Sequence, residues 1–170
     1  MNTKFIIFTS VLLLGVTMMS CNGNRENDRT ERARIDAVLK DHGPAPLVVN
    51  IEDYTLENEN FRLVLWTGEY LQVALMSIPV GGEIGLEVHD GDQFLRIESG
   101  RGRAMMGSTR DALTIIKDVE DDYAIFVPAG KWHNLINTGN TPLKIYSIYA
   151  PVEHPHSTVH RTPECDEHHH

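Results

Sequence analysis

Short runs of alternating hydrophobic and polar residues fill the chain from residue 48 onward. Alternation with a period of two sends successive side chains to opposite faces of a strand, and the β-branched and aromatic residues that dominate these runs favour strands. The clearest run sets one group of side chains against another: Leu143, Ile145, Ser147 and Tyr149 against Lys144, Tyr146 and Ile148. The pattern predicts strands at residues 61–66, 71–78, 83–89, 93–98, 101–106, 112–117, 123–127, 132–137 and 143–149.

Turn-forming residues separate these runs. Thr-Gly-Glu at 67–69, Ser-Gly at 99–100 and Thr-Gly-Asn at 138–140 are the clearest connecting turns. Many short strands at this spacing favour an all-β sandwich or barrel of the jelly-roll kind. The sequence shows no internal repeat and no glycine-rich nucleotide-binding loop.

One helical pattern precedes the strands. Ala33, Ile35, Val38 and Leu39 recur at helical spacing within residues 30–42, and Gly43 and Pro44 follow. We expect a short helix that packs on the outside of the β-domain. A solvated helix that only lengthens the N-terminal tether is the alternative.

The first 21 residues resemble a bacterial lipoprotein leader. Lys4 supplies a positive charge, an apolar run at 5–16 is too short for a comfortable membrane span, and Met18, Met19 and Ser20 lead to Cys21. We expect cleavage before Cys21 and lipidation of its thiol, which would anchor the protein to a membrane without spanning it. A plain transmembrane anchor is the alternative. The predicted location is the bacterial cell envelope, outside the inner membrane.

The rest of the chain is long enough for one domain with one core. The expected organisation is a signal peptide at 1–20, the lipidated cysteine with a tether and short helix at 21–45, one β-domain at 46–162 and a polar tail at 163–170. Cys165 is the only thiol left after lipidation, so no intrachain disulfide is expected, and we expect this thiol to be inert. The terminal residues His168 to His170 are a tag remnant or a natural metal-binding tail, with no catalytic role.

The chain is acidic. Its formal net charge is −9, and removal of residues 1–20, whose only charged residue is Lys4, makes it −10. This charge argues against nucleic acid as a partner and against electrostatic adhesion to anionic lipid.

Two segments carry the candidate chemistry. In the first, Gly81 is followed by Glu87, His89, Gln93 and Gly100, and in the second, Pro-Ala-Gly at 128–130 is followed by His133 and Asn137. Strand alternation puts Glu87 and His89 on one face, and the turn-rich Asp-Gly-Asp at 90–92 would bring Gln93 back on the neighbouring strand. His133 would join them from a distant strand.

We therefore predict one divalent metal ion held by Glu87, His89, Gln93 and His133. Two imidazoles, a carboxylate and an amide oxygen are compatible with Zn, Fe(II), Mn, Ni or Co. Glu87, His89 and His133 can also be read as a two-His, one-carboxylate triad, with Gln93 as a weak fourth ligand or a hydrogen-bonding neighbour. The alternative is a satisfied polar cluster without a metal.

The two segments resemble the motifs of the cupin superfamily, G(X)5HXH(X)3-4E(X)6G and G(X)5PXG(X)2H(X)3N. The resemblance covers roughly residues 71–150, and it implies a double-stranded β-helix (jelly-roll) barrel, here with a short N-terminal helix. Glu87 stands where the family has its first His, Gln93 where it has Glu, and Asp122 where the second motif opens with Gly. Residues 87–98 and 123–162 are most similar to small single-domain bacterial cupins labelled mannose-6-phosphate isomerase. Homodimers are common in this superfamily, so the resemblance also implies a homodimer.

Three functions remain open, and the sequence does not decide whether the chain is an enzyme. It could be a metal-dependent isomerase of a sugar or sugar phosphate, an Fe(II) dioxygenase, or a module that binds a sugar or other small polar metabolite without turnover. The basic residues that could hold an anionic substrate are Arg96, Arg101, Arg103 and Lys131.

Several other side chains carry weaker expectations. Phe94, Phe126 and Tyr146 are expected in the core or in a pocket lining, whereas Trp132 should face outward because it neighbours His133 in an extended strand. Asn137 should bond the turn that follows it. Three further histidines are expected at the surface, with a place at the pocket mouth as the alternative: His154, His156 and His160.

Overall fold

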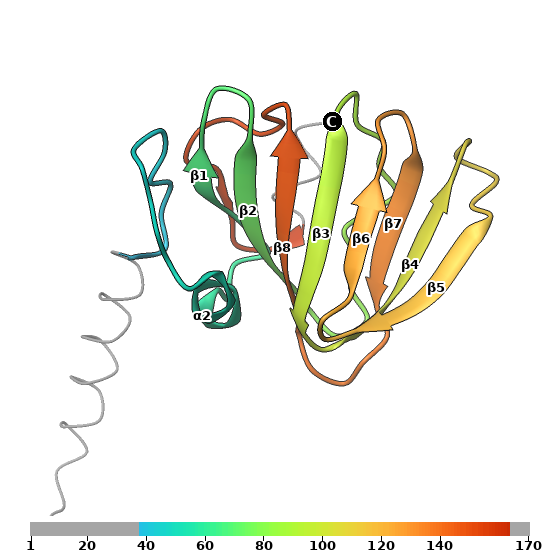
Figure 1. Ribbon diagram of the computed structural model, residues 1–170. Coiled ribbons are helices and arrows are strands. Elements are labelled where there is room, and N and C mark those ends of the chain that lie inside the picture. The colour runs from blue at the N-terminus through green and yellow to red at the C-terminus, as the bar shows by residue number, and fades with distance from the viewer. Residues whose placement is uncertain (1–37, 164–170) are drawn as a thin grey trace, which may run out of the picture.

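The computed structural model describes residues 38–163, which form two antiparallel sheets with one helix outside them. The elements are α2 (Ile51–Glu57), β1 (Arg62–Thr67), β2 (Gln72–Ile78), β3 (Asp92–Ser99), β4 (Arg101–Gly107), β5 (Ile115–Glu120), β6 (Ala124–Val127), β7 (Trp132–Asn137), β8 (Leu143–Ala150) and β9 (Val159–His160). The six-stranded sheet has the order β6-β3-β8-β2-β1-β9, and the three-stranded sheet has the order β5-β4-β7 (Figure 1). The predicted all-β jelly-roll class is confirmed.

The main core lies between the two sheets. Met76, Ile97 and Ile145 of the six-stranded sheet belong to one buried cluster with Ala104 and Leu135 of the three-stranded sheet. Strand alternation creates this inner face: along β8 every second residue is buried, as the run at 143–149 predicts. The two sheets therefore share one interior, into which polar side chains can also project.

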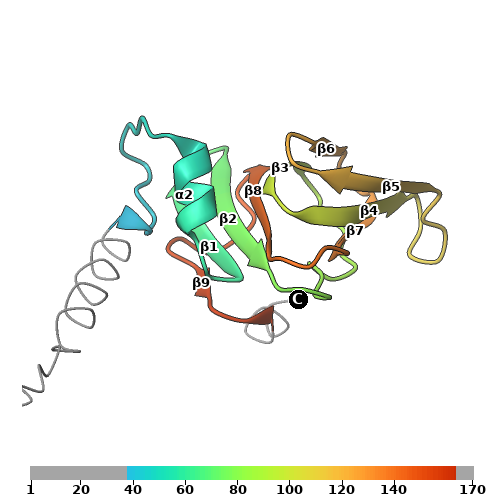
Figure 2. The same ribbon diagram turned by 90° about the horizontal axis from the view of Figure 1, so that it is seen from below.

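The outer face of the six-stranded sheet is partly covered. Ile51 and Tyr54 of α2 pack against Leu63, Leu65 and Leu75, which alternate with the inward residues of β1 and β2. Figure 2 shows α2 lying across this side of the sheet. The helix α2 is absent from the elements predicted above, although Ile51, Tyr54 and the buried Thr55 have helical spacing.

The predicted helix at 30–42 lies mostly outside the described residues. Within its described part, Val38 is helical, and Leu39 is buried against the same outer cluster as α2. The leader with Lys4 and Cys21 also lies outside the described residues, as do Cys165 and the terminal histidines. Within residues 38–163, no helix has the length and apolar character needed to span a bilayer.

One predicted strand is absent from the structure, and another starts later than predicted. Residues 83–89 form no strand and touch β7 only through isolated bridges at Glu83 and Glu87. Gly85, at φ +93°, interrupts the extended backbone there. The strand expected at 112–117 starts later, at Ile115, because a tight turn with a hydrogen bond from Ala112 to Thr109 occupies its first residues.

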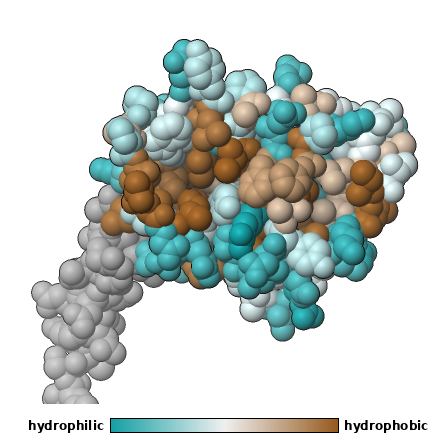
Figure 3. Space-filling view, viewed as in Figure 1, coloured by the Kyte–Doolittle hydropathy of each residue, from teal (hydrophilic) through white to brown (hydrophobic). Residues whose placement is uncertain are grey.

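The aromatic side chains divide between the two faces. Phe94 packs on Phe126 and Tyr146 on the outer face. Phe126 is 69% exposed and lines a surface pocket with Phe94, so the pocket-lining alternative holds for Phe126 and the core alternative is wrong. The hydrophobic patches visible in Figure 3 lie on this side of the molecule. Trp132 is half-buried and faces Arg110, away from the buried His133, as the strand parity predicts. Asn137 accepts a hydrogen bond from Gly139 in the following turn, as predicted.

Candidate metal centre

Three of the four predicted ligand residues come together between the two sheets. Glu87 and His89 lie just before β3, and His133 is the second residue of β7. Glu87 and His133 form an antiparallel bridge in which the two backbone N–H groups donate to each other's carbonyl oxygens, at 3.0 and 2.9 Å. One ligand atom from each residue can be chosen so that all three lie within 4.8 Å of one another. The structure thus brings together three of the four side chains that the spacing predicted to meet.

The atoms that face one another in this cluster lack a hydrogen-bond partner among the described residues. Nε2 of His89 lies 3.1 Å from Glu87 Oε1, and Nε2 of His133 lies 3.2 Å from the same oxygen. The second nitrogen of each ring is held from outside: Nδ1 of His89 lies 3.0 Å from Glu153 Oε1, and Nδ1 of His133 lies 3.0 Å from the Lys131 carbonyl oxygen. Because a carbonyl oxygen only accepts, Nδ1 of His133 carries the proton.

This arrangement of tautomers fits a metal ion. A neutral ring whose Nδ1 donates outward turns the lone pair of Nε2 inward, and here that lone pair meets a carboxylate oxygen. Two nitrogen lone pairs and a carboxylate repel one another unless a metal cation or a proton lies among them. Buried charged groups without a partner are costly, and metal coordination is one of the ways in which proteins satisfy them. The residues present therefore suit a divalent ion with nitrogen and oxygen ligands.

A buried arginine sets the charge around Glu87. Arg62, on β1, is 1% exposed, and its Nη2 lies 4.0 Å from Glu87 Oε2. Burial alone would raise the pKa of Glu87, but the imidazoles of His133 and His89 and the charge of Arg62 hold this pKa well below its ordinary value. Glu87 is therefore a carboxylate at neutral pH. Burial also opposes protonation of His89, whereas the carboxylates of Glu87 and Glu153 raise the pKa of this ring.

Gln93 lies in the same interior but is bonded differently. Its Nε2 donates to Ser147 Oγ at 3.1 Å, while its Oε1 is buried and has no partner among the described residues. Gln93 pairs across the sheet with Tyr149, whose ring lies edge-on to His89 at 5.6 Å between centroids. Because directly paired residues of neighbouring strands point to the same face, Gln93 faces the interior beside Tyr149. Its place as a metal ligand stays a prediction.

The expected hairpin between the ligand segments does not form. Residues 83–87 touch β7, whereas β3, which carries Gln93, pairs with β6 and β8. The turn at 90–92 therefore crosses from one sheet to the other. At this crossing Gly91 passes close to β8, where an added Cβ would lie 2.6 Å from the Ala150 carbonyl oxygen.

Two of the three C-terminal histidines are not simple surface residues. The ring of His154 packs edge-on against Tyr149 at 5.0 Å, and its Nε2 is buried without a hydrogen-bond partner among the described residues. Burial and the nearby charge of Arg62 lower the pKa of His154 to about 3, so this ring is neutral. His160 is buried in β9, and His156 is exposed. The surface expectation is thus wrong for His154 and His160.

Two interior residues of the site, Tyr149 and Arg62, were not predicted from the sequence. Tyr149 stands on the inward face of the alternating run at 143–149, so its parity could have identified it. Arg62 carries no such signal, because it lies outside both motifs and an arginine in a strand is ordinarily exposed.

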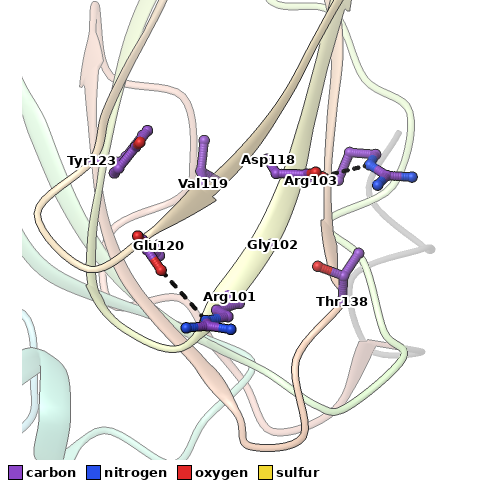
Figure 4. A pocket seen from close by; sticks show the side chains of 8 residues that line it. All are labelled: Arg101, Gly102, Arg103, Asp118, Val119, Glu120, Tyr123 and Thr138. Atoms are coloured by element: carbon purple, nitrogen blue, oxygen red, sulfur yellow. Dashed lines mark hydrogen bonds and ion pairs between the residues drawn. The ribbon is translucent and has the colours of Figure 1, made fainter.

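The four basic residues that could hold an anion lie elsewhere. Arg103 pairs with Asp118 at 2.8 Å and Arg101 with Glu120 at 3.4 Å across β4 and β5, beside a shallow pocket on the exposed face of the three-stranded sheet (Figure 4). Lys131 donates to Ser108, and Arg96 pairs with Glu98 and Asp122. Each of these side chains already has a partner outside the Glu87 cluster.

Sequence and structure comparisons place the chain in a family. Residues 74–149 match the family described as Cupin domain. The uncharacterized protein YrkC of Bacillus subtilis (strain 168) is 60% identical over 126 residues, which are 74% of this chain and 68% of YrkC. The uncharacterized protein L612 of Acanthamoeba polyphaga mimivirus is 40% identical over 110 residues, which are 64% of this chain and 67% of L612.

A solved structure is also similar over most of the described region. The crystal structure of BH2720 from Bacillus halodurans is 60% identical and superimposes with a TM-score of 0.75, covering 76% of this chain and 98% of that protein. The matched region contains the bridge between Glu87 and His133 and the paired sheets around it. Together with the arrangement of the sheets, these relationships show that the chain belongs to the cupin superfamily.

Proposed function

We propose that this cupin binds one divalent metal ion through Glu87, His89 and His133 and uses it to hold a small polar metabolite. The observation that carries the proposal is the meeting of two imidazole nitrogens with one buried carboxylate oxygen, at 3.1 and 3.2 Å, without other partners among the described residues. Gln93 is proposed as a weak fourth ligand or a hydrogen-bonding neighbour, since its buried Oε1 is available.

The chain's own residues prepare the centre for this role. Glu153 and the Lys131 carbonyl orient the two imidazoles, and Arg62 balances the charge of Glu87. A divalent ion with open positions polarises a carbonyl or hydroxyl oxygen and, as Fe(II), binds dioxygen. A metabolite at such a position would meet polar side chains that are already fixed, which lowers the entropy lost on binding.

Among the candidate activities, we propose Fe(II)-dependent oxygenation first. Two histidines and one carboxylate on one side of an ion are the ligand set of non-haem iron oxygenases, in which the other positions stay open for dioxygen and substrate. Glu87 is ionised and the His133 ring presents Nε2, so the donor set matches without a rearrangement of the protein.

Sugar isomerisation is the second candidate activity. It needs a group that moves a proton beside the metal. The ring of Tyr149 lies next to His89, and the neutral His154 packs against Tyr149. A sugar phosphate also needs a cationic holder, and the basic residues near the motifs are engaged elsewhere. Because these basic residues are already paired, we rank isomerisation of a sugar phosphate below oxygenation.

Metal content tests the binding proposal directly. Protein purified without a chelator is expected to hold about one equivalent of metal by elemental analysis, and Glu87→Ala and His133→Ala are expected to lose it. Asp118→Asn, which removes a carboxylate on the exposed face, should retain the metal. Unchanged metal in the Glu87 and His133 variants, with the fold intact by circular dichroism, would contradict the proposal.

Turnover assays separate the two activities. Iron-loaded protein is expected to consume dioxygen when supplied with a suitable small polar substrate, and zinc-loaded protein is not. Interconversion of an aldose and a ketose by both metal forms, without oxygen uptake, would instead support isomerisation. If the protein binds the small polar metabolite but converts none of it, the function is that of a binding module.

The N-terminal sequence supports a further proposal on location. We propose that the chain is exported, lipidated on Cys21 and anchored in the cell envelope by this lipid. Labelled palmitate should be incorporated into the wild-type protein and not into Cys21→Ser. Homodimer formation is likewise proposed from the family resemblance, and light scattering during size-exclusion chromatography tests it.

A further inference from the structure

The segment at residues 151–158, here called the C-terminal strap, runs from the end of β8 to the start of β9 and ties three parts of the molecule together. The buried Gln72 side chain holds its middle with two hydrogen bonds: Nε2 donates to the His154 carbonyl oxygen at 2.9 Å, and Oε1 accepts from the His154 N–H at 2.9 Å. Near its end, the Thr158 carbonyl oxygen accepts from the Val64 N–H at 2.9 Å. These bonds fix the backbone of the strap against β1 and β2.

The strap is further tied to the segment before α2. The Ser157 N–H donates to Asp41 Oδ2 at 3.0 Å. The Asp41 side chain is fully buried and also accepts from the N–H and hydroxyl groups of Thr67. The strap is thus held along its length, and its side chains have defined positions.

One side chain of the strap reaches the candidate metal centre. Glu153 directly precedes the residue that Gln72 clamps, and its Oε1 lies 3.0 Å from Nδ1 of His89. The Glu153 side chain is 31% exposed, whereas that of His89 is 5% exposed. Glu153 therefore approaches the buried ring from the solvent side, opposite to the Nε2 atom that faces Glu87.

This contact has a specific chemical effect. A carboxylate only accepts hydrogen bonds when ionised, so it selects the tautomer of His89 that carries the proton on Nδ1 and leaves the lone pair on Nε2. It also increases the basicity of Nε2 and fixes the plane of the ring. Nδ1 of His133 is held in the same way, but by the neutral backbone carbonyl of Lys131. Of the two groups that orient the imidazoles, Glu153 is therefore the charged one.

We propose that Glu153 is a positioning residue that sets the metal affinity of the centre by orienting and polarising His89. The inference rests on the proposed metal-binding function and adds a residue to that site. Glu153 lies beyond the region that matches the cupin family, which ends at residue 149. The strap therefore adds a part of the site that neither motif contains.

The test compares zinc affinity, measured by competition with a chromophoric chelator, in the full chain and its variants. Glu153→Ala is expected to weaken zinc binding by roughly 10- to 100-fold, which is typical of the loss of a carboxylate behind a metal-bound histidine. Glu153→Gln, whose amide oxygen can still accept from Nδ1, should lose less affinity than Glu153→Ala. Asp118→Asn is the matched control and should bind zinc as the wild type does.

Three further measurements separate orientation of the ring from a merely structural role. In zinc-loaded wild-type protein, long-range nitrogen–proton NMR correlations should show the His89 ring protonated on Nδ1, and the visible spectrum of the cobalt form should change in Glu153→Ala. The urea midpoint of the metal-free protein should change little, because a half-exposed hydrogen bond of this kind contributes little to stability.

Each outcome decides one question. If the wild type binds zinc and Glu153→Ala binds it equally tightly with an unchanged cobalt spectrum, the role assigned to Glu153 is wrong, while the metal site stands. If the wild type binds no metal, the proposed function fails and this inference fails with it.

Discussion

Arg62 is 1% exposed, although arginine is rarely buried without a charged partner. Its position beside Glu87 helps the interior to tolerate a carboxylate that faces two imidazoles. At the scale of single residues, the sequence predicted the polar side chains that meet, because alternation orients Glu87 and His89 by a local rule. It did not predict Arg62, whose burial depends on a neighbour far away in the chain.

Removal of Arg62 should leave the charge of Glu87 uncompensated. Arg62→Met is expected to destabilise the metal-free protein by about 3 kcal/mol, because loss of one partner leaves a buried charge unpaired. Urea unfolding of both proteins at neutral pH measures the difference.

The exposed pair between Arg103 and Asp118 offers the control for this experiment. Arg103→Met should leave the urea midpoint within experimental error, because solvent screens exposed ion pairs. Equal stability of Arg62→Met and the wild type would show that Arg62 does not compensate Glu87.

Asp41 makes a pH-dependent contribution to stability. Burial alone would raise its pKa, but hydrogen bonds from Thr67, Ser157 and Gly43 lower the pKa below the ordinary 3.8. A carboxyl group whose pKa is lower in the folded state stabilises the fold fully above its unfolded pKa, and this contribution disappears as the pH falls through the folded pKa. The stability advantage of the wild type over Asp41→Asn should therefore be constant above about pH 5 and shrink below it.

Urea unfolding of the wild type and of Asp41→Asn between pH 7 and pH 2.5 measures this difference. The two proteins differ in Asp41 and in its contact with His156 Nε2, 3.4 Å from Asp41 Oδ2, so the same comparison in a His156→Gln background isolates Asp41. An advantage that grows as the pH falls would show that the pKa of Asp41 is raised in the folded protein.

At the scale of elements, local patterns predicted strands better than connections. The starts of β1, β2, β3, β4, β6, β7 and β8 lie within one residue of their predicted positions, because alternation and turn residues are local signals. The local pattern at 83–89 predicts one strand of a hairpin, but Gly85 breaks the extended backbone there. The helix α2 was missed because its short apolar pattern is ambiguous until it packs on Leu63 and Leu75.

The turn before β7 should be sensitive to substitution at Gly130. This glycine has φ +72°, and its N–H donates to the His89 carbonyl oxygen at 2.8 Å, so it joins the two ligand segments. Gly130→Ala is expected to cost about 1–2 kcal/mol, because a Cβ strains the left-handed conformation even though no atom lies within 4 Å of it. Thermal or urea unfolding measures the cost.

Gly130→Asn provides the matched comparison, since asparagine adopts the left-handed conformation more readily than alanine. It should be more stable than Gly130→Ala. If alanine were tolerated as well as asparagine, backbone strain would not be the reason for glycine at this turn.

At the scale of the whole molecule, the candidate centre is built from both sheets. His133 comes from the three-stranded sheet, and Arg62 and Tyr149 come from the six-stranded sheet. Glu87 and His89 come from the connection between β2 and β3, which is bridged to β7 at Glu87. A ligand held by such a centre should stabilise the whole fold, because unfolding separates all of its ligands.

Metal should therefore raise the unfolding temperature. At a free metal concentration 100 times the dissociation constant, mass action adds about 2.7 kcal/mol to the stability of the folded state. Differential scanning calorimetry with and without zinc measures the shift, and Glu87→Gln should abolish it. A shift of equal size in Glu87→Gln would place the bound metal at another site.

The sequence by itself determined the all-β class, most strand positions and the pairing of Glu87 with His89 on one side, because these depend on residues close together in the chain. Tertiary structure alone decided that the turn at 90–92 crosses between sheets, that α2 covers the outer face, and that Arg62, Tyr149 and Glu153 surround the ligands. The physical reason is that burial and charge compensation depend on partners from distant segments, which no local pattern of residues specifies.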